Sequence, residues 1–211
     1  MGLGSYRKNL GRVAAVLGIL QGVSWTFLTL VAIIIHYWQP AIETGTTYTR
    51  LIQIMLYSKF LVDDGSVSGT TFILNPNNFV VIMWIYFVIS VLWDSFSVDM
   101  LTAINHNKKR RAIVERLWGI LTLFISLLDL VVTILLATDY AACGNASPEG
   151  VTMDEFFCYT SVGIAMTIAG RGFTLWVVNI VLSIVLFRET YEDIREDDSN
   201  ASVNTPKHVY I

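Results

Sequence analysis

The chain has 211 residues, of which 54% are hydrophobic and only 15% charged, and its formal net charge at pH 7 is -3. A soluble domain carries roughly 25% charged residues, and a chain this short cannot bury so much apolar surface in a water-soluble fold. The composition therefore argues against a soluble enzyme and a disordered protein, and the small negative net charge argues against a nucleic-acid binder.

Four apolar segments follow one another along the chain, at about residues 13–38, 79–104, 117–137 and 159–187. Each reaches the roughly 20 residues that a helix needs to cross about 30 Å of hydrocarbon. The first segment is too long for the apolar core of a cleaved signal peptide, which spans about 7–15 residues. The sequence therefore predicts an all-α integral membrane protein that folds as a four-transmembrane-helix bundle.

Basic residues predict the orientation of this bundle. Of the fourteen Lys and Arg residues, eleven lie in residues 1–12, in the loop between the second and third segments, or after residue 187. Such residues concentrate on the cytosolic side of membrane proteins. We expect a cytosolic N-terminus (1–12), a transmembrane domain (13–187) with outer loops at 39–78 and 138–158, and a disordered cytosolic tail (188–211). The outer loops are acidic, with Glu43, Asp63, Asp64, Asp139, Glu149, Asp154 and Glu155.

The outer loops carry two further features. Both cysteines, Cys143 and Cys158, fall in the second loop, which predicts one disulfide in an oxidising compartment, with a free Cys158 at the membrane edge as the alternative. Asn145 begins a glycosylation sequon, although Pro148 and the nearby bilayer disfavour its use. In the first loop, apolar residues between 48 and 61 have helical spacing, and this segment either covers the bundle or contacts another protein.

Three charged residues lie deep in the predicted spans: Asp94, Asp129 and Arg171. Each is centred on a polar stripe at helical spacing, and these stripes must face the bundle interior. The stripes comprise Ser90, Asp94 and Ser97; Thr122, Ser126, Asp129 and Thr133; and Thr167, Arg171 and Thr174. We expect Asp129 to pair with Arg171, with Asp94 joining from below, as a structural ion pair. The alternative is a proton or ion path, which would favour broken helices, and no proline interrupts a span.

Small residues recur at intervals of four on two spans and predict close helix packing. They are Ala14, Gly18 and Gly22 on the first span, and Ser161, Ala165 and Ala169 on the fourth. The partner is either another span of this chain, which we favour, or another protein.

Motifs for catalysis or cofactor binding are missing from the sequence. The three His residues are far apart, the two Cys residues form no CxxC pair, and no P-loop, GxGxxG or GxSxG occurs. We therefore expect no enzymatic activity, no metal and no cofactor. The chain ends in His-Val-Tyr-Ile, where Val209 and Ile211 fit the groove of a PDZ domain.

The chain resembles a junctional tetraspan, but its first outer loop lacks the claudin Trp…Leu-Trp-Cys-Cys signature and it has no tetraspanin Cys-Cys-Gly. Residues 5–10 (Ser-Tyr-Arg-Lys-Asn-Leu), residues 116–119 (Arg-Leu-Trp-Gly) and the length are similar to insect four-span septate-junction proteins of the Pasiflora type. This resemblance implies a role in assembling an occluding junction and an epithelial barrier.

The leading hypothesis is a non-enzymatic, multi-pass plasma-membrane protein that organises a junctional or adhesion complex at lateral cell contacts. Its expected partners are the lipid bilayer, other junctional membrane proteins and a PDZ scaffold, with no nucleic acid. The rival is an accessory subunit of a channel or transporter, or a small transporter that uses Asp94, Asp129 and Arg171.

Overall fold

A computed structural model describes residues 3–38, 60–61, 73–104, 108–143, 153–171 and 173–203. In this part of the chain the regular structure is helical: α1 (Leu3–Trp38), α3 (Pro76–Ala103), α4 (Lys108–Ala142), α5 (Met153–Ala169) and α6 (Thr174–Val203). Four helical stretches within it are long and apolar enough to cross a membrane: Lys8–Trp38, Pro76–Ala103, Arg110–Ala142 and Cys158–Glu192. The all-α class and the four long apolar spans are therefore confirmed.

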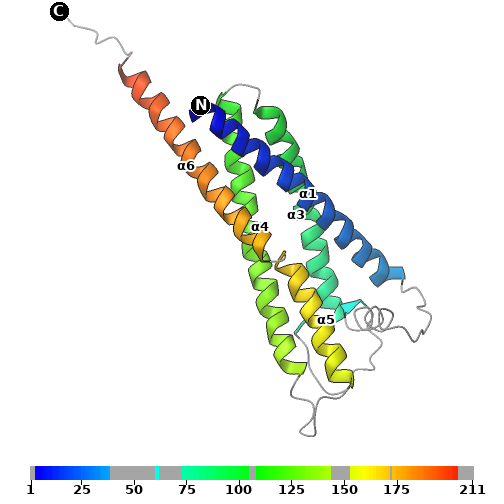
Figure 1. Cartoon of the computed structure of the whole chain (residues 1–211). Coiled ribbons are helices and arrows are strands. Elements are labelled where there is room, and N and C mark those ends of the chain that lie inside the picture. Colours follow the sequence, from blue (N-terminus) through cyan, green and yellow to red (C-terminus); the bar gives the residue numbers. More distant parts are fainter. Residues whose placement is uncertain are drawn as a thin grey trace, which may run out of the picture.

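The helices form an elongated bundle in which α4 packs against more of the other helices than any other helix does (Figure 1). Helix α1 packs mainly along α3, whereas α4 packs against α3, α5 and α6. The start of α1 and the end of α6 lie at the same end of the bundle, and the end of α4 and the start of α5 lie at the opposite end (Figure 1). The first and the last described residues therefore lie towards the same end of the bundle.

The outer surface of the bundle is apolar, whereas that of a water-soluble bundle is mainly polar. Large apolar side chains point outward on every span, such as Leu20, Phe27, Ile120 and Val181, which are 51–64% exposed. The interior holds apolar side chains, such as Trp93, Trp118 and Leu186, and among them buried hydroxyl and amide groups, namely Thr29, Ser90, Ser97, Thr122, Asn179 and Ser183. Since buried polar groups need partners and exposed apolar ones avoid water, this polarity suits a hydrocarbon surrounding.

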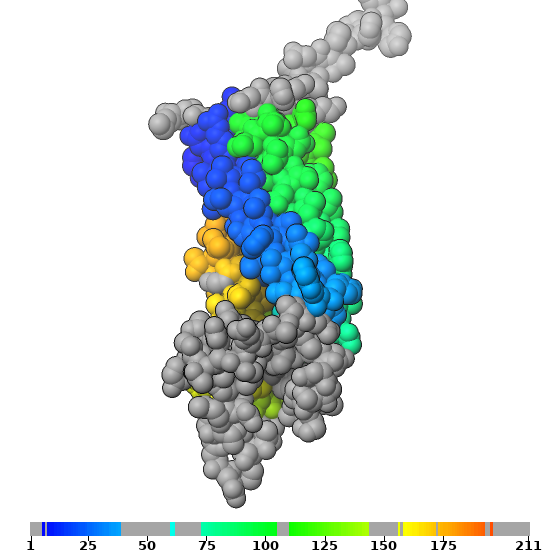
Figure 2. Space-filling view, turned by 90° about the vertical axis from the view of Figure 1, so that its right-hand side faces the viewer, coloured from blue at the N-terminus to red at the C-terminus, as the bar shows by residue number. Residues whose placement is uncertain are grey.

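Glycines bring α1 and α3 into close contact, and α1 crosses the face of its neighbours obliquely (Figure 2). A Cβ atom at Gly18 would overlap Ser97 Oγ, and one at Gly22 would overlap the Asp94 carboxylate. Ala14 is fully buried in the same face. The small-residue repeat of the first span therefore packs within the chain, as favoured by the sequence analysis.

The second small-residue repeat lies on α5. Ser161 and Ala169 are buried, and Ala165 packs against the core beside them. This repeat also faces the interior of the bundle.

The last helix extends beyond its expected end. Helix α6 continues to Val203, so the disorder expected from residue 188 does not apply as far as that residue. Thr190 is fully buried and donates a hydrogen bond to Glu115 of α4 at 3.3 Å. Arg188 and Glu192, one helical turn apart, are joined at 3.1 Å. Val209 and Ile211 lie outside the described residues.

Candidate functional site: a buried charge cluster

The fourth span is broken near its middle, where α5 ends at Ala169 and α6 begins at Thr174. Arg171 and Phe173 adopt left-handed backbone angles, with φ of 48° and 58°. For a residue other than glycine, these backbone angles cost on the order of 1–3 kcal/mol, and they persist only where the surrounding structure holds the residue in place. The expectation of uninterrupted spans was therefore wrong here. Glycines at 170 and 172, rather than a proline, weaken the helix at this point.

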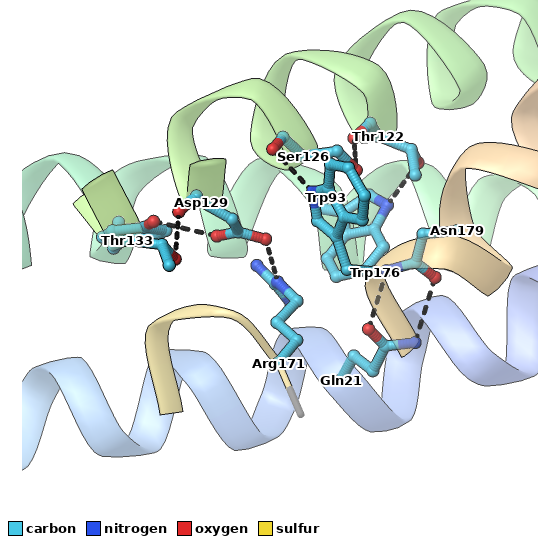
Figure 3. A network of polar contacts seen from close by, with 10 residues as sticks. Gln21, Trp93, Thr122, Ser126, Asp129, Thr133, Arg171, Trp176 and Asn179 are labelled. Atoms are coloured by element: carbon cyan, nitrogen blue, oxygen red, sulfur yellow. Dashed lines mark hydrogen bonds and ion pairs between the residues drawn. The ribbon is translucent and has the colours of Figure 1, made fainter. Parts of the chain in front are cut away.

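The break directs Arg171 into the bundle, where it meets Asp129 of α4 (Figure 3). Arg171 Nε lies 2.6 Å from Asp129 Oδ2, and both side chains are 1% exposed. The hydroxyl of Tyr86, from α3, donates to the other carboxylate oxygen of Asp129 at 2.8 Å. The structure thus brings together the two charges that the sequence analysis paired and adds a third helix to the contact.

Two indole rings pack against the guanidinium group. Its central carbon lies 4.8 Å from the ring centroid of Trp25 and 5.1 Å from that of Trp93. A cation over an indole face gains roughly 2 kcal/mol when it is desolvated. The Nη1 and Nη2 atoms of Arg171 are buried and have no hydrogen-bond partner among the described residues. The indole faces are therefore the main surroundings of this charge apart from Asp129.

Further hydrogen bonds next to the ion pair join helices to one another (Figure 3). Gln21 of α1 and Asn179 of α6 form a reciprocal amide pair, with N–O distances of 2.9 and 3.2 Å. Trp176 donates its indole N–H to the backbone carbonyl of Ser126 at 2.8 Å. Trp93 donates to Thr122 Oγ1 at 3.0 Å. Helices α1, α3, α4 and α6 thus all contribute to one polar region of the interior.

The three predicted polar stripes have different outcomes. Those of α3 and α4 face inward, since their Ser and Thr members are buried or half-buried. The third stripe is wrong, because Thr167 and Thr174 are exposed while Arg171 is buried. The break rotates α6 relative to α5, so helical spacing across it no longer defines one face. Thr167 instead lines an open pocket of about 490 Å³ with Tyr140, Tyr159 and Met166.

Asp94 does not join the ion pair. It is half-buried between α3 and α1, where its Oδ2 atom accepts a long hydrogen bond of 3.5 Å from Thr26. Its Oδ1 atom is buried against Gly22 and has no hydrogen-bond partner in the described part of the chain. The expectation that Asp94 joins Asp129 and Arg171 was therefore wrong, because Asp94 faces α1 at Gly22 instead of the break in span four.

The opposite end of the bundle is held by other polar groups. The Cys143–Cys158 disulfide is confirmed, and it joins the end of α4 to α5 with 5.9 Å between the Cα atoms. Asp139, which the sequence analysis placed in an outer loop, lies within α4 and is 2% exposed. Its carboxylate accepts the backbone N–H groups of Ile73 and Leu74 at 2.8 and 3.0 Å. Asp139 therefore fixes the chain before α3 and adds nothing to an acidic surface.

Part of the first outer loop also contacts the bundle. Phe60 is buried with its ring 5.0 Å from that of Phe79, and the Leu61 carbonyl lies 2.9 Å from a ring nitrogen of His36. These contacts favour a covering role for the end of the 48–61 segment. The rest of that segment and Asn145 lie outside the described residues.

Several residues of the cluster were missed by the sequence analysis: Gln21, Trp25, Tyr86, Trp93 and Asn179. A signal for them exists, since Gln21 and Asn179 are amides inside apolar segments and therefore need buried partners. The tryptophans are near mid-span, away from the interfaces where such residues usually gather. Their contact with Arg171 depends on the helix break, which the sequence pattern did not predict.

The cluster is suited to joining helices. Its two charges neutralise each other over 2.6 Å, and both side chains are shielded from the surface. Within the described residues no group of three or more His, Cys, Asp or Glu side chains is placed to hold a metal ion. No protein-family model, curated protein or solved structure matches this chain.

Proposed function

We propose that the chain is a non-enzymatic membrane protein that organises a cell–cell junction or adhesion complex in the plasma membrane of epithelial cells. In this proposal all four apolar spans cross the bilayer and both termini lie in the cytosol. Two observations support this placement: the outward-facing apolar side chains and the concentration of basic residues at the end of the bundle where both termini lie.

The observation that carries the proposal is that the two central charges, Arg171 and Asp129, are already paired with each other. Arg171 forms an ion pair with Asp129, and indole rings of α1 and α3 lie against its guanidinium group. Charges held this way fix the mutual positions of helices, whereas a conducting path needs charged groups that meet water or ions. A rigid multi-helix platform of this kind suits a protein whose work is to hold other membrane proteins in place.

The junctional part of the proposal is supported by the similarity of residues 5–10 and 116–119 to septate-junction tetraspans. The apolar C-terminal residues Val209 and Ile211 add the prospect of a cytosolic PDZ scaffold as a partner.

Localisation tests this proposal. A tagged full-length chain, expressed in a polarised epithelium, is expected to concentrate at lateral contacts and to recover slowly after photobleaching. A matched variant that lacks Ile211 is expected to recover faster, because the scaffold contact is lost. An even distribution over apical and lateral membranes, with equal recovery of both forms, would contradict the proposal.

A second candidate, a small transporter, is favoured by one observation. The helix break lies beside a buried charge, and discontinuous membrane helices often carry substrate or ion sites. The purified full chain in proteoliposomes distinguishes the two. We expect no proton or ion flux, whereas flux that the Asp94→Asn and Asp129→Asn variants both lose would establish the transporter.

A further inference from the structure

Asp94 differs from the other acidic residues that the structure describes within or next to the apolar spans. Asp129 is paired with Arg171, Asp99 with Arg110 at 2.8 Å, and Asp139 accepts two backbone N–H groups. Asp94 has only the long 3.5 Å hydrogen bond from Thr26. A poorly satisfied carboxylate inside an apolar span is costly, roughly 2.5–3.5 kcal/mol at a helix centre.

The position of Asp94 leaves it accessible from outside the bundle. It lies nine residues before Ala103, the last residue of α3, which corresponds to roughly 14 Å of helix rise. Its side chain is half-buried in the seam between α1 and α3, and Gly22 makes room for it. Its Oδ1 atom is buried against Gly22, but the side chain as a whole is only partly enclosed, and it lies away from the ion pair.

Several apolar side chains are exposed around Asp94. Val91 and Val98 lie one helical turn on either side of it and are 41% and 51% exposed. Val23 of α1, one turn from Thr26, is 56% exposed. Short branched side chains permit close approach of another helix, and they offer Asp94 no hydrogen bond of their own.

We propose that the α1–α3 seam at Asp94 docks a transmembrane helix of a different protein that carries a Lys or Arg near the middle of its span. The occupant follows from charge: a basic group would supply the partner that Asp94 lacks, in a medium where isolated charges are most costly. A second copy of this chain does not fit, since the basic residue described inside its apolar spans, Arg171, is already bound to Asp129. The inference rests on the proposed membrane role and names the chemistry of one partner.

A defined probe tests the proposal with the full-length chain in phospholipid vesicles. The probe is a single-span polyleucine helix with one central Lys, compared with the same helix with Leu at that position. Energy transfer between labels on probe and protein reports association. We expect the Lys helix to bind about tenfold more tightly than the Leu helix, as an interaction of about 1.4 kcal/mol would give.

Variants separate this site from general effects. Asp94→Asn is expected to remove the preference for the Lys helix, whereas Asp99→Asn, at the end of the same helix, is expected to retain it. Formation of the Cys143–Cys158 disulfide serves as the check that each variant folds. Equal binding of both helices to the wild-type protein, or an unchanged preference in Asp94→Asn, would overturn the inference. Either result would leave the lateral localisation of the proposed function untouched, so the two failures are distinguishable.

Discussion

The two sides of the bundle are held together by different means. On the side of α4, α5 and α6, an ion pair, an indole hydrogen bond and a disulfide join the helices. On the side of α1 and α3, glycines allow backbones to approach, and the acid at the seam is poorly satisfied. Specific polar bonds therefore fix the two halves of the broken helix, whereas the two continuous helices are positioned mainly by close packing at their glycines.

The strongest test of the polar side is Asp129→Asn, which leaves Arg171 buried without its counter-charge. We expect a loss of about 3–5 kcal/mol in the free energy of unfolding, measured by denaturant titration in detergent micelles. The double variant Asp129→Asn with Arg171→Gln is expected to be more stable than the single one, because no uncompensated charge is left. A single variant as stable as the wild type would show that the ion pair does not hold the break.

The next largest effect concerns the disulfide at the end of the same side. Cys143→Ser with Cys158→Ser opens a loop of 15 residues, and up to about 3 kcal/mol of stability is lost. The thermal unfolding midpoint of the double variant, compared with the reduced wild type as control, measures this loss. Equal midpoints for the oxidised and reduced wild type would mean that helix packing alone holds the end of α4 against α5.

The glycine-packed side is tested by Gly18→Ala. The new Cβ would overlap Ser97 Oγ and lie 3.0 Å from Trp118 Nε1, so the helices must separate. We expect a loss of about 2 kcal/mol in the free energy of unfolding. Gly163→Ala on α5 is the matched control, since its Cβ would meet only Tyr140 at 3.8 Å, and it should leave stability unchanged or raised. Equal effects of the two substitutions would contradict shape-determined packing at the seam.

A smaller effect is expected where the two sides meet, at the hydrogen bond from Tyr86 to Asp129. Tyr86→Phe removes only the hydroxyl and should cost about 1 kcal/mol, as for other hydrogen bonds inside membranes. Tyr140→Phe, at a ring that packs against Tyr159, is the control and should cost less than about 0.5 kcal/mol. The difference between the two unfolding free energies reports the bond.

The smallest expected effect has the opposite sign. Asp94→Asn removes a poorly satisfied carboxylate while keeping its shape, so the isolated chain should gain up to about 1 kcal/mol in its free energy of unfolding. Together with the loss in Asp129→Asn, this gain would establish that Asp129 stabilises the isolated bundle and that Asp94 does not. A loss comparable to that of Asp129→Asn would place Asp94 among the groups that hold the bundle together.

Hydropathy and length were sufficient to predict the four apolar helices, because about 20 apolar residues leave few other outcomes. The Asp129–Arg171 contact also followed from the sequence, since two opposite charges within apolar helices need each other. The ends of the helices were harder to predict from the sequence. Helix α6 continues past residue 188, where Thr190 packs against α4, and a contact between such distant segments cannot be predicted from local composition.

The cost of burying a charge and the cost of exposing apolar surface to water both depend on the residue type. The sequence by itself therefore determined the helical class, the number of apolar spans and the need for a central ion pair. The tertiary structure alone decided where the fourth span breaks, which acid obtains the arginine and which is left at the seam. These outcomes depend on the rotation of one helix against another. Gly22 opposite Asp94 and the two indoles beside Arg171 set that rotation, and only the packed bundle brings them together.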